Sequence, residues 1–243
     1  MKPQKPNMQN QVVLYGHHAV FEALKNPSRK IIKVLITPEN EAEFKKTFPT
    51  SSYQVVQKKE IEKNLPQNAV HQGFAAFAKP LEPVYLEDLI SATSDKEKCT
   101  ILILDQLTDP QNIGAIMRSA AAFNVSGIIV QDKNAPFESG AMAKASAGTI
   151  EFMPFVRATN LSRAIETLKK AGFWIVGMDG YAKQSLNDIN KNAKLAVVMG
   201  SEGAGMRRLI QESCDITVKL NMNPRVESLN VSVAAGIVLY ELM

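Results

Sequence analysis

The sequence predicts an α/β protein of two domains, and three observations support this prediction. Its 243 residues suit one large or two small domains, at roughly 100–200 residues per domain. Strand-like and helix-like patterns alternate along the chain, and the runs Ile101–Leu104 and Ala196–Met199 are continuously apolar, which is typical of parallel strands covered on both faces. The segment Lys79–Pro83 has two prolines in five residues, which oppose both helix and strand and therefore mark a boundary.

The predicted first domain covers residues 1–78, and residues 79–98 form a linker. Apolar residues at helical spacing follow Gly16 as far as Leu24, and Asn26-Pro27 ends this helix. The rest of the domain alternates between strands and helices, as in a small α/β sandwich. The expected strands are 31–36, 53–56 and 73–78, the expected helices are 39–48 and 58–64, and the linker holds a short helix at 86–91.

The predicted second domain, residues 99–243, alternates more regularly. Apolar runs predict its strands, and amphipathic stretches between them predict its helices. The expected strands are 100–104, 127–130, 174–176, 195–199 and 216–220. The expected helices are 112–123, 140–147, 161–171, 206–212 and 229–242.

The composition excludes several classes of protein. Hydrophobic residues at 45% and charged residues at 21% are ordinary for a globular chain and exclude a disordered tail or a collagen-like repeat. The longest uncharged stretches have 13 residues, 119–131 and 228–240, whereas a membrane-spanning helix needs about 20. Two distant cysteines, Cys99 and Cys214, and only three histidines predict neither a disulfide scaffold nor a metal site. The N-terminus lacks the apolar run of a secretory signal, so we expect a cytoplasmic location.

Charge is distributed unevenly between the two parts. Residues 1–80 carry 12 Lys and Arg against 6 Asp and Glu, a net of +6, while the remainder has a net of −2. A basic segment beside a near-neutral body is typical of a nucleic-acid-binding module joined to an active domain. Ordinary solvated lysines are the alternative.

Polar residues follow three of the predicted strands, where ligands bind in open parallel sheets. After Leu104, Asp109-Pro110 opens a helix that contains Asn112, Gly114 and Arg118. Gly114 and Arg118 lie one turn apart on one face, so the glycine leaves room for a ligand beside the guanidinium. A close helix contact beside a surface arginine is the alternative.

The second polar segment is Gly200-Ser-Glu-Gly-Ala-Gly-Met206. Its three glycines allow the backbone to approach a ligand closely, and Glu202 lies within the loop. A flexible turn is the alternative. The chain contains no Gly-x-Gly-x-x-Gly dinucleotide fingerprint, which argues against a nucleotide-dependent oxidoreductase.

The third polar segment follows Leu220 and contains Ser228, Asn230 and Ser232 before an apolar helix. These residues either cap that helix or converge on a site with the two other loops. The helix has little polar face, so it is either a core helix or a dimer interface.

In this order, Asn112-x-Gly-x-x-x-Arg118, Gly200-x-Glu-x-x-Gly-Met206 and Ser228-Leu-Asn-Val-Ser232 resemble the three motifs of the SpoU/TrmH-type RNA 2′-O-methyltransferases. The segments Tyr15–Val20 and His71–Gly73 resemble the RNA-binding module, similar to ribosomal proteins of the L30/L7Ae type, of the bacterial 23S rRNA guanosine 2′-O-methyltransferases. The resemblance covers nearly the whole chain.

This resemblance implies a trefoil-knotted second domain, S-adenosylmethionine as cofactor, an RNA substrate and a homodimer, with no metal. The catalytic set that it implies is Asn112, Arg118, Glu202, Ser228 and Asn230. The implied cofactor-binding positions are Gly177, Gly180, Met199, Gly200, Gly205, Leu220, Met222 and Leu229. The third motif departs from the family pattern, because Asn221 and Pro224 replace its usual Pro and Gly.

The chemistry constrains the role of Arg118. In the family this arginine has been proposed as the base, but an arginine stays protonated, with a pKa above about 12. We therefore expect Arg118 to bind the target phosphate and stabilise the developing alkoxide, an electrostatic role. Asn112 would orient Arg118 or the ribose, and Glu202 would fix the loop or neutralise Arg118.

The leading hypothesis is therefore methylation of a guanosine ribose in large-subunit rRNA. A tRNA ribose methyltransferase is the alternative within the same class. A non-catalytic RNA-binding or ribosome-assembly protein is the alternative from another class, since the basic first domain alone would support it.

Overall fold

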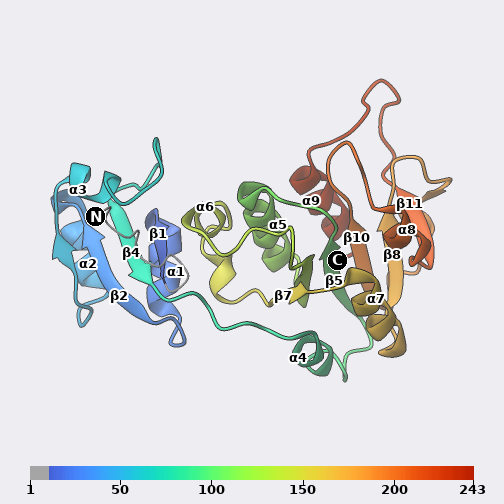
Figure 1. Ribbon diagram of the computed structural model, residues 1–243, viewed down its shortest axis with the longest axis horizontal. Coiled ribbons are helices and arrows are strands. Elements are labelled where there is room, and N and C mark those ends of the chain that lie inside the picture. Colours follow the sequence, from blue (N-terminus) through green and yellow to red (C-terminus); the bar gives the residue numbers. More distant parts are fainter. Residues whose placement is uncertain (1–10) are drawn as a thin grey trace, which may run out of the picture. The chain divides into compact units, whose positions relative to one another are not determined.

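The computed structural model describes residues 11–243. The prediction that the N-terminus lacks a secretory signal concerns residues 1–10, which lie outside the described part. The chain divides into two compact units, and Figure 1 labels many of their helices and strands. The first unit combines residues up to Glu82 with Phe137–Phe152, and the second combines Pro83–Pro136 with Met153–Met243. This division differs from the predicted boundaries in two respects: the predicted linker, residues 79–98, is shared between the two units, and a segment from the middle of the chain belongs to the first unit.

The first unit contains a four-stranded sheet in the order β1-β4-β2-β3. Strand β4 is antiparallel to both β1 and β2, and β3 runs parallel to β2. The sequence does not predict β1, because only four residues form it. The strands are β1 (Val12–Tyr15), β2 (Ile31–Ile36), β3 (Gln54–Val55) and β4 (Phe74–Ala78), and the helices between them are α1 (His17–Lys25), α2 (Glu41–Thr47) and α3 (Lys58–Glu62).

An aromatic cluster packs α1 and α2 against this sheet. The Phe21 ring meets the rings of Phe44, Phe48 and Phe74 edge to face, with centroids 5.1 to 6.1 Å apart. The predicted helix 39–48 forms two elements, because Pro38–Asn40 is a separate 3-10 turn before α2 begins.

Helix α6 (Gly140–Ala145) and the 3-10 turn Thr149–Glu151 complete the first unit. Gly140 permits the close approach of α6 to β1, because a Cβ there would lie 2.2 Å from the Val13 carbonyl oxygen. A buried arginine fixes the segment, since Arg29 Nη2 lies 2.7 Å from Glu151 Oε1 and Arg29 Nη1 lies 2.7 Å from Glu138 Oε1. Sequence patterns predict the helix but not these long-range partners.

The second unit contains a seven-stranded parallel sheet in the order β7-β6-β5-β10-β8-β11-β9. This confirms the parallel sheet that the apolar runs predict. The sequence predicts neither β7 nor β9, because β7 follows a proline and includes Arg157, and β9 has only two residues. The trefoil knot stays a prediction. The strands are β5 (Cys99–Leu104), β6 (Gly127–Gln131), β7 (Phe155–Ala158), β8 (Trp174–Met178), β9 (Gln184–Ser185), β10 (Lys194–Met199) and β11 (Ile216–Lys219).

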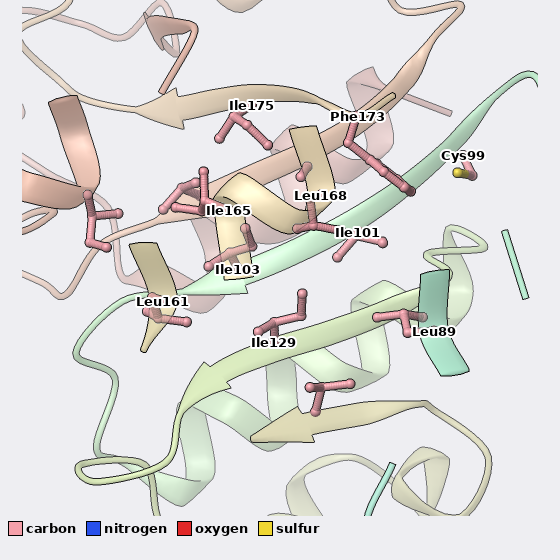
Figure 2. Packing of buried hydrophobic residues seen from close by; sticks show 14 residues of the cluster. Leu89, Cys99, Ile101, Ile103, Ile129, Leu161, Ile165, Leu168, Phe173 and Ile175 are labelled. Carbon is pink, nitrogen blue, oxygen red and sulfur yellow. The ribbon is translucent and has the colours of Figure 1, made fainter. Parts of the chain in front are cut away.

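Helices cover both faces of this sheet. The helices are α4 (Leu86–Ser91), α5 (Pro110–Ala122), α7 (Leu161–Lys170), α8 (Arg208–Glu212) and α9 (Val231–Glu241). On one face, Ile101 and Ile103 of β5 pack with Leu89 of α4 and with Ile165 and Leu168 of α7 (Figure 2). Successive side chains of a strand point to opposite faces, so the alternate residues of β5 face the other way. Helices α5 and α9, which contact each other, remain to cover that second face.

Two further observations concern the predicted elements. The last two helices begin later than predicted, α8 at Arg208 and α9 at Val231, and the Asn230 side chain caps α9. Within residues 11–243, no helix has the length and apolar character needed to cross a membrane.

Candidate functional site

The start of α5 and the start of α9 meet through two asparagines. Asn230 Nδ2 donates a hydrogen bond to Asn112 Oδ1 over 3.2 Å. Asn230 Oδ1 in turn accepts hydrogen bonds from the Ser232 backbone N–H at 2.9 Å and from Ser232 Oγ at 2.6 Å. The capping interaction and the convergence of segments, which the sequence leaves as alternatives, therefore occur together at Asn230.

The charged members of the predicted catalytic set are exposed and not paired with each other. Arg118 lies on α5 two turns after the helix starts, and its guanidinium has no hydrogen bond or ion pair within residues 11–243. Glu202 is exposed in the glycine-rich loop and forms no ion pair with Arg118. Ser228 is also exposed, three residues before α9. These groups are therefore available to a ligand rather than committed to the fold.

The glycine-rich loop turns back on itself immediately after β10. Ser201 and Gly205 exchange two backbone hydrogen bonds, 3.1 and 2.9 Å long. A Cβ on Gly200 would lie 2.1 Å from the carbonyl carbon of Gly205, so only glycine permits this return. Gly203 and Gly205 have φ angles of 82° and 66°, in the left-handed region that glycine adopts without strain. The loop thus has a defined shape, unlike a flexible turn.

The predicted cofactor positions differ in how open they are. Gly177 is buried in β8, where a Cβ would lie 2.8 Å from Cys214 Sγ and 2.9 Å from Met206 Cε, so its bare side is filled by the protein. Gly180 and Gly205 have open space on the side where a Cβ would stand. The remaining positions, placed by their exposure, are Met199 (buried), Leu220 and Leu229 (half-buried) and Met222 (exposed).

The open glycines and the half-buried leucines fit a cofactor held through backbone groups. Beside Gly180, the flanking residues Asp179 and Tyr181 help to line a cavity of about 410 Å³. Leu220, Leu229 and the glycine-rich loop do not line that cavity. Most of the predicted positions therefore lie at or after the ends of β8, β10 and β11, and this cavity adjoins only one of them, Gly180.

An ion pair that the sequence does not predict, between a buried aspartate and a partly exposed arginine, holds the end of the glycine-rich loop. The Asp105 side chain is fully buried at the end of β5, and its carboxylate accepts hydrogen bonds from the Arg207 backbone N–H at 2.8 Å and from Arg207 Nε at 2.9 Å. Arg207 Nη2 lies 2.7 Å from Asp105 Oδ1. The sequence carries a weak signal for this pair, since both residues adjoin motif segments, but one aspartate after a strand is a common pattern.

The loop with the two departures from the family pattern forms a closed turn. The Val226 N–H donates to the Asn223 carbonyl oxygen over 2.9 Å, which places Pro224 at the second position of a β-turn, where proline is favoured. Asn221 Nδ2 donates to Ser185 Oγ over 3.2 Å and ties the start of the loop to the end of β9. Both unusual residues thus have a structural role in this chain.

The two cysteines are free thiols, and neither is suited to nucleophilic chemistry. Burial raises the pKa of the Cys99 thiol and raises the pKa of Cys214 to about 11. Within the described residues, no group of three or more His, Cys, Asp or Glu is placed to hold a metal ion.

Comparisons with known proteins agree with this arrangement. Residues 13–84 match the family described as "RNA 2'-O ribose methyltransferase substrate binding", and residues 100–240 match the "SpoU rRNA Methylase family". The "Putative TrmH family tRNA/rRNA methyltransferase YacO" of Bacillus subtilis (strain 168) is 40% identical over 236 residues, which cover 93% of each chain. The "Putative TrmH family tRNA/rRNA methyltransferase" of Staphylococcus aureus (strain COL) is 37% identical, over 95% of this chain and 94% of the relative.

A solved structure has the same fold. The SpoU methyltransferase AviRb from Streptomyces viridochromogenes, in complex with the cofactor AdoMet, superposes with a TM-score of 0.78 at 23% sequence identity, over 96% of this chain and 89% of that chain. The family matches and the curated relatives extend over both units of the chain. The chain therefore belongs to the SpoU/TrmH family of RNA 2′-O-ribose methyltransferases.

Proposed function

We propose that this chain transfers a methyl group from S-adenosylmethionine to the ribose 2′-hydroxyl of a guanosine in 23S rRNA. The observation that carries the proposal is the hydrogen bond between Asn112 and Asn230, which brings the first and third motif segments together at the ends of two helices. The exposed guanidinium of Arg118, on the same helix as Asn112, supplies a free cation for an RNA phosphate.

The cofactor would be held by backbone groups around Gly180, Gly205, Leu220 and Leu229, where the chain is open. When bound, S-adenosylmethionine supplies an electrophilic methyl group on a sulfonium. The AdoMet complex of the similar AviRb structure supports this part of the proposal.

The side chains of this chain would position the RNA rather than take its proton. Arg118 stays protonated, so it binds the phosphate next to the target ribose and stabilises the developing alkoxide. The proton leaves the 2′-hydroxyl to a phosphate oxygen or to water. Asn112, held by Asn230, orients the ribose, while Glu202 and Ser228 contact the substrate from their exposed loops.

The first unit would bind the folded RNA through phosphate contacts, which give affinity without reading sequence. The family match of residues 13–84 supports this role. A tRNA ribose is the second candidate substrate, because the curated relatives carry names that include both tRNA and rRNA. The free thiols of Cys99 and Cys214 are consistent with a cytoplasmic location, which is part of the proposal.

A homodimer is also part of the proposal, and helix α9 supports it. Val233, Ile237 and Tyr240 recur at helical spacing on α9 and are 51, 40 and 62% exposed. An apolar stripe of this kind on a helix that also carries a motif segment fits a subunit interface. Sedimentation analysis of the wild type and of the variant Ile237→Glu tests it; a wild type that is monomeric at micromolar concentration would contradict the dimer.

Methyl transfer from labelled S-adenosylmethionine to total RNA that lacks ribose methylation, with the product mapped, tests the proposed function. We expect label in one 2′-O-methylguanosine of 23S rRNA. Label in tRNA would keep the chemistry and change the substrate, and bound RNA without label would favour a non-catalytic binding protein.

The role of Arg118 is tested in the same assay with Arg118→Lys, which keeps the charge and removes the planar, two-pronged geometry. We expect a loss of at least tenfold in the rate of transfer, and Arg163→Lys, at an exposed position of α7, is the matched control. Near-wild-type activity of Arg118→Lys would contradict positioning through the guanidinium.

A further inference from the structure

Helix α8 (Figure 1) is joined to one loop that carries predicted cofactor positions and contacts a second. The glycine-rich loop, with Gly200 and Gly205, leads directly into α8. The loop that follows β8 carries Gly180, and a side chain of α8 reaches it. This five-residue helix therefore meets two segments that are proposed to hold S-adenosylmethionine through their backbone groups.

The start of α8 is fixed to two strands of the sheet. Arg207, its N-terminal cap residue, is held by the carboxylate of Asp105, which directly follows β5. Met206, the residue before it, packs against β8, because Met206 Cε lies 2.9 Å from the place where a Cβ of Gly177 would stand. The end of the glycine-rich loop is thus held by β5 and β8 at once.

The loop after β8 closes around Asp179. The Asp179 carbonyl oxygen accepts a hydrogen bond from the Ala182 N–H at 3.0 Å, and the Asp179 N–H donates to the Val218 carbonyl oxygen of β11 at 2.9 Å. Its carboxylate accepts a hydrogen bond from the Tyr181 N–H through Oδ1 at 2.9 Å. Gly180, with open space on the side where a Cβ would stand, lies inside this turn. The shape of the turn therefore depends on where the Asp179 side chain is held.

Gln211 holds that carboxylate from α8. Its side-chain Nε2 donates a hydrogen bond to Asp179 Oδ2 over 2.9 Å, between residues 32 positions apart in the chain. The neighbouring ion pair of Arg208 with Glu212, 88 and 54% exposed, joins two residues of the helix itself. The pair of Gln211 with Asp179 differs, because it joins the helix to a loop. One oxygen of the Asp179 carboxylate thus shapes the turn, and the other fixes the turn to α8.

A cofactor that is held through backbone groups needs those groups in place before it binds. Ordering a loop during binding lowers affinity, and contacts that fix the loop in advance remove part of this loss. We infer that Gln211 is a positioning residue for S-adenosylmethionine, which acts through Asp179 on the loop that contains Gly180. This inference rests on the proposed function, since that loop is part of the proposed cofactor site. Arg207 has the equivalent role for the glycine-rich loop through Asp105, so one helix positions both loops.

A series of substitutions at Gln211 tests the inference in the full chain without RNA. Gln211→Leu removes the donor, and we expect the Kd for S-adenosylmethionine, measured by calorimetry, to rise about fivefold, the size of one surface hydrogen bond to a charged group. Gln211→Lys supplies another donor and should bind with nearly wild-type affinity. Gln211→Glu places a carboxylate against that of Asp179, so it should bind more weakly than Gln211→Leu.

Arg208→Gln is the matched control, because it breaks an exposed ion pair within the same helix. Position 211 is exposed and all the residues introduced there suit a helix, so melting temperatures should stay within about 2 °C of the wild type. In methyl transfer, Gln211→Leu should raise the KM for S-adenosylmethionine and leave kcat and the KM for RNA unchanged. A merely structural role would lower the melting temperature and would not order the Kd values by the charge at position 211.

Hydrogen exchange of the cofactor-free chain measures the loop directly. The amides of Tyr181 and Ala182 are bonded to Asp179, so they should exchange faster in Gln211→Leu than in the wild type, and at the wild-type rate in Arg208→Gln. Unchanged exchange in Gln211→Leu, or faster exchange with an unchanged Kd, overturns the inference. Neither measurement needs methyl transfer. A wild type that binds S-adenosylmethionine without labelling 23S rRNA therefore overturns the proposed function, and the comparison of Kd values still decides the role of Gln211.

Discussion

Replacing Arg29 with methionine tests whether the segment 137–152 is held to the first unit by buried charge. The Arg29 side chain is fully buried, and its Nε and Nη2 donate to the two carboxylate oxygens of Glu151 at 2.9 and 2.7 Å. Nη1 donates to the Lys79 carbonyl oxygen at 2.9 Å and lies 2.7 Å from Glu138 Oε1. Burial acts to lower the pKa of Arg29, but the hydrogen bonds and charges of both glutamates outweigh it and raise that pKa.

The expected cost follows from what the substitution leaves behind. Methionine fills much of the volume of the arginine stem but leaves two carboxylates, 2 and 14% exposed, without their cation. Breaking a buried ion pair by removal of one partner costs about 3–5 kcal/mol. With a urea dependence of about 1.5 kcal/mol per molar for a unit of this size, the unfolding midpoint of the first unit should fall by roughly 2–3 M.

Urea unfolding followed by two signals measures this effect. Far-ultraviolet circular dichroism reports on both units, whereas fluorescence of Trp174, the single tryptophan, reports on the second. Lys25→Met is the control, since the pair of Lys25 with Glu22 is 55 and 31% exposed and should contribute under about 0.5 kcal/mol. A midpoint for Arg29→Met within about 0.5 M of the Lys25→Met value would refute the reasoning.

Three further predictions concern single residues. Burial raises the pKa of Cys214 to about 11, so this thiol should react with iodoacetamide at pH 8 on the order of 100-fold more slowly in the folded chain than in the urea-unfolded chain. Equal rates in the two states would contradict its burial. Burial raises the pKa of Glu138, so as the pH falls this carboxylate binds a proton at a higher pH in the folded chain than in the unfolded chain. The unfolding free energy of the wild type relative to Glu138→Gln should therefore rise as the pH falls from 7 towards about 4.3, the usual value for glutamate, and urea titrations that show the opposite slope would refute this. Gly200→Ala should lower the affinity for S-adenosylmethionine at least tenfold in calorimetry, because its Cβ would lie 2.1 Å from the backbone of Gly205. Gly180→Ala, whose Cβ would have no atom within 4 Å, is the control for thermal stability. Equal melting temperatures of the two variants would contradict the clash.

The elements that could be predicted from the sequence are those whose signal is local. The apolar runs of β5 and β10 specify parallel strands because both faces of these strands are buried. Strand β7 has no such signal, because Arg157 interrupts its pattern with a side chain that donates to the carbonyl oxygen of Pro136 at 2.7 Å. Short strands at the edges of sheets depend on their neighbours for pairing, and a single sequence does not reveal those neighbours.

The candidate site was predictable to the extent that its residues follow strands. Asn112 and Asn230 are 118 positions apart, and only the order of the family motifs suggests that they belong together. The pair of Asp105 with Arg207, 102 positions apart, escapes prediction, because neither residue type is unusual at its position.

The membership of Phe137–Phe152 in the first unit has a consequence for the order of biosynthesis. When the ribosome has released residue 82, the cation of Arg29 and the outer surface of β1 still lack the helix and the carboxylates that cover them. At roughly 5–20 residues per second, the missing segment arrives about 4 to 14 s later, after β5, α5 and β6 of the other unit have been made. The unit that begins first along the chain is therefore completed only after the second has been partly made, and expression of residues 1–98 alone would yield a fragment in which Arg29 lacks both of its carboxylate partners.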